Sequence, residues 1–158
     1  MVARVLRDRR GVTALEFALI APVFLTIMLL AMEAAWQLAI GAGLDHGTRL
    51  AARWAATGQA PPAGSSRTLE VQRLVRESAG LPIRPDRLTV TPESFAAIGS
   101  LTSGVSTPGI GGPDQLTRYR IEYFADPLTP LGAGLLTGGM FRHAFAVIVR
   151  NEPYVPVP

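Results

Sequence analysis

The apolar run over residues 12–40 constrains this chain more than any other feature, because its only charged side chains are Glu16 and Glu33. Between residues 17 and 32 the one polar side chain is Thr26. A helix that crosses a bilayer needs about 20 predominantly apolar residues. A single segment in lipid must also satisfy its own backbone polar groups, which a helix does. The run therefore predicts one transmembrane helix.

Charged residues before the run predict its orientation, because the cytoplasmic ends of membrane spans carry an excess of basic residues. The first ten residues hold Arg4, Arg7, Arg9 and Arg10 against Asp8. We therefore expect a basic cytoplasmic leader over residues 1–11, a transmembrane helix over residues 12–42 and an extracytoplasmic domain over residues 43–158. A cleaved secretory signal is the alternative, but its apolar region is typically only about 7–15 residues long.

Composition narrows the functional classes. The chain of 158 residues has no cysteine, which excludes disulfides and cysteine metal sites. Its net charge of +3 arises in the leader, because residues 12–158 contain equal numbers of arginines and acidic residues. A nucleic-acid-binding domain should carry a basic patch or stripe, so we expect no nucleic-acid partner.

Glu16 places a carboxylate inside the apolar run, as the fifth residue after Gly11. A charged side chain near the centre of a membrane helix costs about 2.5–3.5 kcal/mol on insertion scales, and less near the end of the helix. Two interpretations follow: Glu16 lies at the cytoplasmic interface, or it meets a cation from another chain inside the membrane. Farther along, Pro22 predicts a mild kink, which membrane helices tolerate.

The run RRGVTALEFALIAP resembles the N-terminus of type IV prepilins, in which a basic leader, a Gly and a Glu five residues later precede an apolar helix. With Glu16 followed by Phe17, this run is more specifically similar to the TadE-like family, the pseudopilins of tight-adherence (Tad or Flp) pili. The resemblance implies that a prepilin peptidase cleaves between Gly11 and Val12 on the cytoplasmic side. It further implies a bacterial inner-membrane protein whose partners are this peptidase, other pilin or pseudopilin subunits and the Tad secretion machinery.

Glu33 lies 17 residues after Glu16, or roughly 25 Å along a helix that rises 1.5 Å per residue. It therefore falls near the outer face of the bilayer when Glu16 lies near the inner face. Trp36 follows within one turn, and Trp favours membrane–water interfaces. We interpret Glu33 as an interfacial carboxylate.

The helix should continue past the membrane over residues 44–57 and end at Gly58. Its face toward the domain is predicted to comprise Leu44, Gly47, Leu50, Ala51 and Trp54. Glycines weaken a helix by about 1 kcal/mol each relative to Ala. Gly41, Gly43 and Gly47 therefore suggest a flexible joint where the chain leaves lipid.

A second helix and a small sheet are predicted for the domain. Residues 67–79 predict an amphipathic helix that is capped by Ser66 and keeps its charged side chains in solvent. Alternation of apolar and polar residues predicts short strands at 88–91, 118–124 and 141–150. The expected fold is α+β and pilin-like, with an antiparallel sheet of about three strands packed on the long helix. The ending FAVIVRNEPY is similar to the closing strand of TadE-like proteins.

Two long segments, 92–115 and 125–139, separate the predicted strands. Loops of this length are usually functional or disordered. Both are rich in Gly, and neither contains a motif that assigns it a function.

Candidate catalytic residues are few. The two histidines, His46 and His143, belong to no H-E-x-x-H pattern, and no G-x-S-x-G nucleophile elbow is present. His143 lies on the apolar side of the third predicted strand, so we expect a hydrogen-bonded core residue. We therefore expect a protein that is a peptidase substrate, is not an enzyme and needs no cofactor or metal.

Two functional classes stay open. The first is a minor pseudopilin that acts in pilus biogenesis and adhesion after processing at Gly11. The second is an unprocessed, single-span envelope protein with an extracytoplasmic binding domain. The spacing of Gly11 and Glu16 favours the first class, because a simple anchor has no need of a buried carboxylate at that position.

Overall fold

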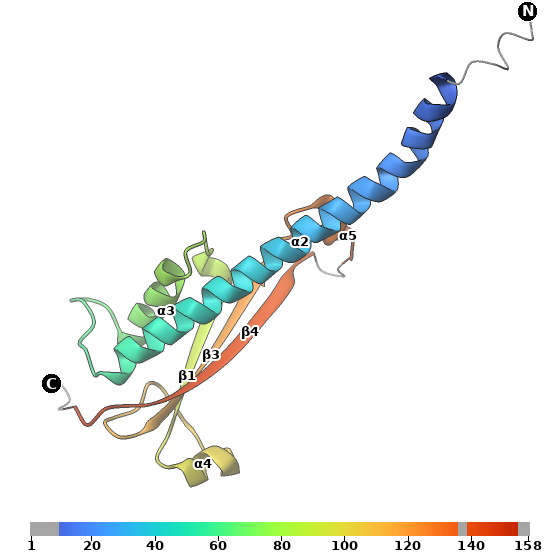
Figure 1. The fold of residues 1–158 in the computed structure, drawn as a ribbon. Coiled ribbons are helices and arrows are strands. Elements are labelled where there is room, and N and C mark those ends of the chain that lie inside the picture. Colours follow the sequence, from blue (N-terminus) through green and yellow to red (C-terminus); the bar gives the residue numbers. More distant parts are fainter. Residues whose placement is uncertain (1–9, 136–138, 155–158) are drawn as a thin grey trace, which may run out of the picture.

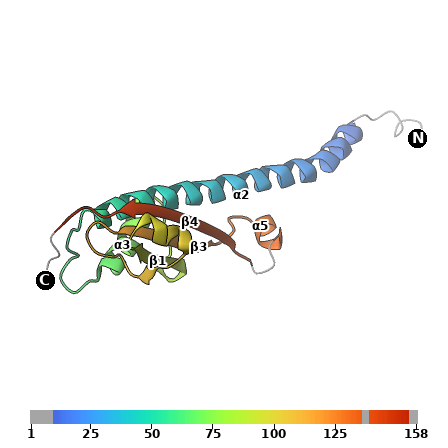
Figure 2. The same cartoon turned by 90° about the horizontal axis from the view of Figure 1, so that it is seen from below.

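The computed structural model describes residues 10–135 and 139–154. Its elements in chain order are α2 (Arg10–Ala56), α3 (Arg67–Ser78), η1 (Pro85–Arg87), β1 (Leu88–Phe95), α4 (Ile98–Ser103), β2 (Thr107–Pro108), β3 (Leu116–Ala125), α5 (Pro130–Leu135) and β4 (Phe141–Arg150). Figure 1 shows α3 and the sheet beside the C-terminal half of α2, whereas the N-terminal half of α2 stands free. Figure 2 shows the same free half from a second direction. The α+β fold with a long N-terminal apolar helix is confirmed.

α2 is one continuous helix of 47 residues, or about 70 Å at 1.5 Å per residue. The predicted flexible joint is wrong, because Gly43 and Gly47 are packing positions. A Cβ atom at Gly43 would overlap the carbonyl oxygen of Ala79, and one at Gly47 would overlap that of Val75. The G-x-x-x-G spacing therefore lets α3 and the residue after it approach the backbone of α2 closely.

The free half of α2 bends (Figure 1) and contains Pro22. Proline lacks a backbone N–H and its ring crowds the preceding turn of a helix. The hydroxyl of Thr26 donates a hydrogen bond of 2.8 Å to the carbonyl oxygen of Pro22. These features account for the mild kink that the sequence predicts at this position.

α3 begins as predicted, because the side chain of Ser66 accepts a hydrogen bond of 3.2 Å from the backbone N–H of Leu69. The predicted solvent exposure of its charged residues is wrong for Glu70, which is buried. Arg73 binds both carboxylate oxygens of Glu70. This pairing explains how the burial is tolerated, and the hydrogen bonds from Arg73 lower the pKa of Glu70.

The sheet has four antiparallel strands in the order β2-β1-β3-β4, one more than expected. The additional strand is the short β2, in which Thr107 pairs with Ser94. β1 extends to Phe95, four residues beyond the predicted end, because its second half also pairs with β3. The segments predicted as loops therefore contain regular structure, namely the end of β1, α4 and β2 in the first and α5 in the second.

The core lies between the C-terminal half of α2, α3 and the inner face of the sheet. Strand β3 contributes Tyr119, Ile121 and Tyr123 to it, which confirms the predicted alternation. Small side chains on α2, including Ala51 and Ala55, are fully buried there. On the predicted packing face of α2, Leu50 is the exception, since it is 46% exposed.

Candidate functional site: the free half of the long helix and its anchor

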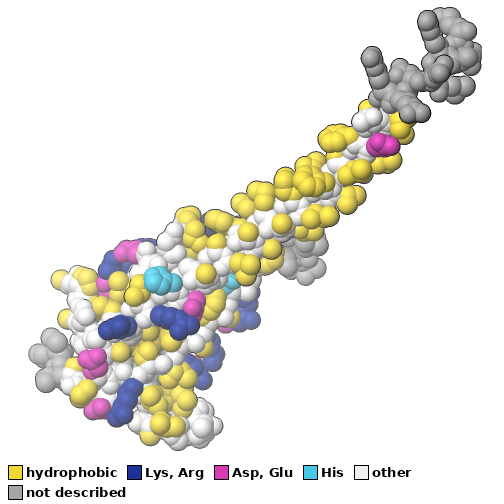
Figure 3. Space-filling model, in the orientation of Figure 1, with side chains coloured by type: hydrophobic (Ala, Val, Ile, Leu, Met, Phe, Trp, Pro, Cys, Tyr) yellow, Lys and Arg dark blue, Asp and Glu magenta, His cyan; other side chains and the backbone are white. Residues whose placement is uncertain are grey.

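The free half of α2, the part of the helix before Glu33, is apolar over residues 11–32 apart from Thr13, Glu16 and Thr26. Its most hydrophobic window has a mean hydropathy of 2.3, and none of that window is buried. Figure 3 shows a mostly apolar surface along this part of the helix, with one acidic side chain near its N-terminal end, whereas the other charged side chains in this view gather over the domain. Exposed apolar surface of this extent marks an interaction site or a membrane contact. By length and composition, α2 can serve as a membrane anchor.

Gly11 and Val12 lie in the first turn of α2, where both are exposed. No described atom of another segment lies within 4 Å of the position that a Cβ of Gly11 would occupy. The bond predicted as the cleavage site is therefore free of contacts with the described part of the domain.

Glu16 and Phe17 follow one turn after Val12 on the same free segment. Glu16 is exposed and makes no hydrogen bond or ion pair with any side chain that the structure describes. Phe17 is 72% exposed. Residues four apart are neighbours on a helix surface, so Val12 and Glu16 share one face of α2. The structure thus places all four predicted site residues on one short, free helical segment.

Glu33 lies where the free half of α2 meets the domain, and it is only 4% exposed. Its carboxylate accepts four hydrogen bonds from the described residues. The backbone N–H of Thr129 donates at 2.8 Å and the hydroxyl of Thr129 at 3.0 Å. The backbone N–H of Leu128 donates at 3.2 Å and the amide of Gln37 at 2.8 Å. Glu33 therefore anchors the chain before α5 to the long helix.

Residues at the start of α5 fit closely around the Glu33 carboxylate. Thr129 precedes Pro130, the first residue of α5, and its hydroxyl oxygen accepts a hydrogen bond of 3.1 Å from the backbone N–H of Gly132. A Thr cap followed by Pro is typical of a helix start. A Cβ at Gly132 would overlap the Glu33 side chain, so glycine permits the close approach.

Sequence reasoning missed the role of this anchor. The sequence indicates an interfacial carboxylate at Glu33, whereas two of its hydrogen-bond partners, Leu128 and Thr129, lie 95 and 96 positions away in the chain. The Thr129–Pro130 pair was a local signal of a helix start. No local pattern links that pair to Glu33.

Gln37 extends the anchor to strand β4. Its side-chain oxygen lies 3.0 Å from Nε2 of His143, and its side-chain nitrogen also lies 3.3 Å from the carbonyl oxygen of Asp126. His143 is half-buried, and burial lowers its pKa. The expectation of a hydrogen-bonded histidine is confirmed, with the ring at the edge of the core rather than inside it.

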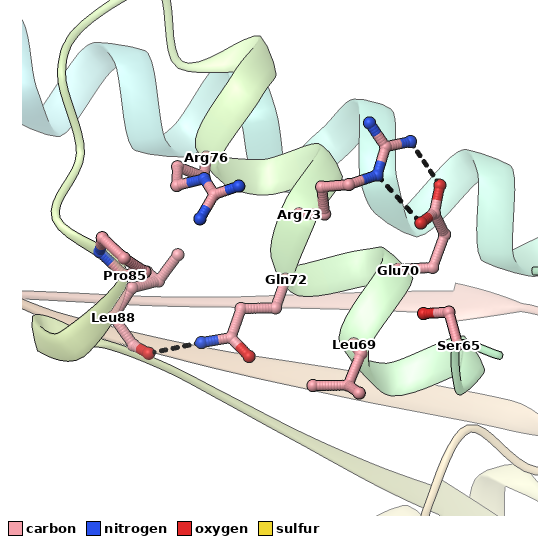
Figure 4. A pocket seen from close by; sticks show the side chains of 8 residues that line it. All are labelled: Ser65, Leu69, Glu70, Gln72, Arg73, Arg76, Pro85 and Leu88. Carbon is pink, nitrogen blue, oxygen red and sulfur yellow. Dashed lines mark hydrogen bonds and ion pairs between the residues drawn. The ribbon is translucent and has the colours of Figure 1, made fainter. Parts of the chain in front are cut away.

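The domain has a shallow depression of about 320 Å³ between α3 and the start of β1. In Figure 4, Arg73 is bound to Glu70, and Gln72 donates a hydrogen bond of 2.9 Å to the carbonyl oxygen of Leu88, whereas Arg76 and Ser65 are not bound to the other residues drawn. Among residues 10–135 and 139–154, no group of three or more His, Asp or Glu side chains is placed to hold a metal ion.

Comparison with known proteins adds one match. The sequence model of the family described as TadE-like protein matches residues 11–53. No curated protein and no solved structure matches the chain. The matched region begins at Gly11 and includes the whole free half of α2. It supports a membrane protein related to Tad pili, and over residues 11–53 the chain carries the TadE-like pattern that its N-terminal sequence predicts.

Proposed function

We propose that this chain is a minor pseudopilin of a Tad-type pilus assembly machine. A prepilin peptidase cleaves it after Gly11, and the mature chain acts in pilus biogenesis and adhesion. The observation that carries the proposal is the Gly11–Glu16 spacing at the start of a free, apolar helix, within a family match that begins at Gly11.

The proposed topology places residues 1–11 in the cytoplasm, the helix in the bacterial inner membrane and the domain in the periplasm. The arginine excess before the helix supports this orientation. Val12 and Glu33 are 21 positions apart, or about 32 Å along a helix, close to the ~30 Å thickness of a bilayer core. Within the proposed span of residues 12–42, the part before Glu33 would face lipid, and the part after it would also contact the domain.

Cleavage would give Glu16 a cationic partner. The new α-amino group of Val12 has an ordinary pKa of about 7.7–8.0, so it is mostly protonated at neutral pH. Attraction between opposite charges is much stronger in a medium of low dielectric constant than in water. Glu16 has no partner among the described side chains, so it is available to a second chain.

The amine of one subunit would neutralise Glu16 of its neighbour, which would fix the axial register of packed helices. A pair within one helix is also possible, because Val12 and Glu16 lie one turn apart. The resemblance to type IV pilins favours pairing between chains. The competing interpretation is that Glu16 only guides the peptidase or sets the depth of the helix in the bilayer.

The alternative function is an unprocessed, single-span envelope protein whose periplasmic domain binds a partner. It shares the topology but requires neither cleavage at Gly11 nor a partner for Glu16. In the shallow depression between α3 and β1, Arg73 is bound to Glu70 and Gln72 to the carbonyl oxygen of Leu88, so neither side chain specifically supports this alternative.

The mass of the N-terminal peptide tests the proposal. In cells with the matching prepilin peptidase, we expect the mature chain to begin at Val12. Gly11→Ala should block or slow cleavage and leave the leader attached. Gly99→Ala is the matched control, because Gly99 is also a helical glycine with no described atom near its Cβ position. A wild-type chain that retains its leader in the presence of active peptidase would contradict the proposal.

A further inference from the structure

The segment around α5 has an unusual composition for the surface of a periplasmic domain. No residue from Pro127 to Phe141 is charged. Of its described side chains, Leu128 is 48% exposed and Met140 is 41% exposed. We define the α5 segment as residues 127–135 together with Gly139 and Met140.

The charges that border this segment are bound within the domain. Asp126 pairs with Arg87 and Arg84, on the side of η1. Arg142 pairs with Glu122 of the adjacent strand. The α5 segment is therefore an uncharged surface between two charged edges whose side chains are already engaged.

The position of the segment is fixed along the axis of the long helix. Glu33 holds the backbone of Leu128 and Thr129, so α5 lies beside α2 at the base of its free half. Figure 1 shows α5 at the end of the domain toward the free helix, whereas α4 lies at the opposite end. Because Glu33 falls about 32 Å from Val12 along the helix, the segment should lie at the outer boundary of a bilayer core of about 30 Å.

We propose that the α5 segment is a second membrane contact, which places exposed apolar side chains in the periplasmic boundary of the lipid bilayer beside α2. The contact rests on the proposed membrane span of α2, and it adds a lipid-facing surface to the folded domain. Apolar side chains at such a boundary bury surface among the headgroups and the ends of the acyl chains. With two attachment points, α2 and the α5 segment, the domain would be held in one orientation on the membrane rather than swivelling about a single helix.

A second copy of the chain is the competing occupant of this surface. Two observations favour lipid. The segment lies beside α2 at Glu33, where the length of the helix places the outer boundary of the bilayer core. The uncharged part of the sequence also ends at Phe141, where strand β4 begins. A protein partner would protect the same side chains only when subunits associate. The two occupants therefore differ in their dependence on the protein-to-lipid ratio.

Site-specific fluorescence in lipid vesicles tests the contact. The chain has no cysteine, so Leu128→Cys can be labelled uniquely with a polarity-sensitive fluorophore in the full chain. Its side chain is exposed, and the bonds to Glu33 come from its backbone, so the anchor is kept. Ile98→Cys is the matched control, because Ile98 is 73% exposed and belongs to α4 at the far end.

We expect nitroxide-bearing lipids to quench the label at Leu128 at least fivefold more strongly than the label at Ile98, with the reverse order for an aqueous quencher. Leu25→Cys in the free half of α2 reports the span itself. Quenching by lipid at Leu25 but not at Leu128 would overturn the second contact and leave the span standing. Protection at Leu128 that vanishes when the protein is diluted in lipid would assign the surface to a second copy and would also overturn the proposal.

Discussion

Removing the negative charge of Glu33 should release the start of α5 from the long helix. The two carboxylate oxygens divide the four donors equally: Oε2 accepts from the backbone and hydroxyl of Thr129, and Oε1 accepts from Leu128 and Gln37. Glu33→Gln keeps one oxygen and replaces the other with an NH2 group. Whichever way the amide turns, one backbone N–H, that of Thr129 or that of Leu128, then faces an NH2 group, because only the Thr129 hydroxyl and the Gln37 amide can reorient to accept.

The size of the effect follows from that backbone donor. A buried donor that loses its acceptor costs about 1–3 kcal/mol. Local opening lets water reach the freed N–H, so we expect the free energy of local opening to fall by about 1–3 kcal/mol. Since 1.4 kcal/mol corresponds to a factor of ten, amide hydrogen exchange should accelerate roughly 5- to 140-fold.

Hydrogen exchange measured by mass spectrometry on the full chain in detergent micelles gives the test. The amide hydrogens to follow are those of Thr129 and Gly132, while the strands of the sheet report on global unfolding. Glu77→Gln is the matched control, because Glu77 is an exposed carboxylate on α3 that contacts only arginines of its own helix. Unchanged exchange at Thr129 and Gly132 in Glu33→Gln would refute the anchoring role.

Three further predictions concern packing, pH and topology. Gly47→Ala should destabilise the domain by about 1–3 kcal/mol in thermal unfolding, because its methyl group would overlap the Val75 carbonyl; Gly41→Ala, which meets only ordinary contacts, should cost less. Burial lowers the pKa of His143, so the unfolded chain takes up its proton first and stability should decline as the pH falls below about 6.5; His143→Gln should flatten that decline. A reporter that is active only in the periplasm should function when fused after Pro158, and activity of a cytoplasm-only reporter there would contradict the topology.

The local patterns of the sequence predicted much of the fold, because they depend on near neighbours. Apolar continuity predicted α2, the Ser66 cap predicted the start of α3, and alternation predicted β3 and β4. These signals express helix and strand periodicity directly. The family resemblance depended on the same kind of short-range pattern, the spacing from Gly11 to Phe17.

Interactions between distant segments could not be predicted in this way. Gly43 and Gly47 suggest a flexible joint in the sequence, yet in the structure they allow close packing against α3 and Ala79. The role of each glycine depends on the distant segment that packs against it. Glu33 suggested a membrane interface, yet it also holds a loop more than ninety positions away. Strand β2 is too short and too rich in neighbouring glycines to produce a periodic signal.

Replacement of Glu16 tests the central claim of the proposed function most directly. Glu16→Gln keeps the size and polarity of the side chain and removes its charge. The proposal predicts that the variant still inserts and is still cleaved after Gly11, but that it supports few or no pili. Glu77→Gln, the same change on the surface of the domain, should leave pili unaffected.

The measurement is a count of pili per cell by electron microscopy, on cells in which mass spectrometry has shown a mature chain that begins at Val12. Loss of pili in Glu16→Gln with normal pili in Glu77→Gln is the predicted result. Normal pili on cells that contain a cleaved, stably produced Glu16→Gln chain would contradict charge pairing between subunits and leave Glu16 as a marker of position.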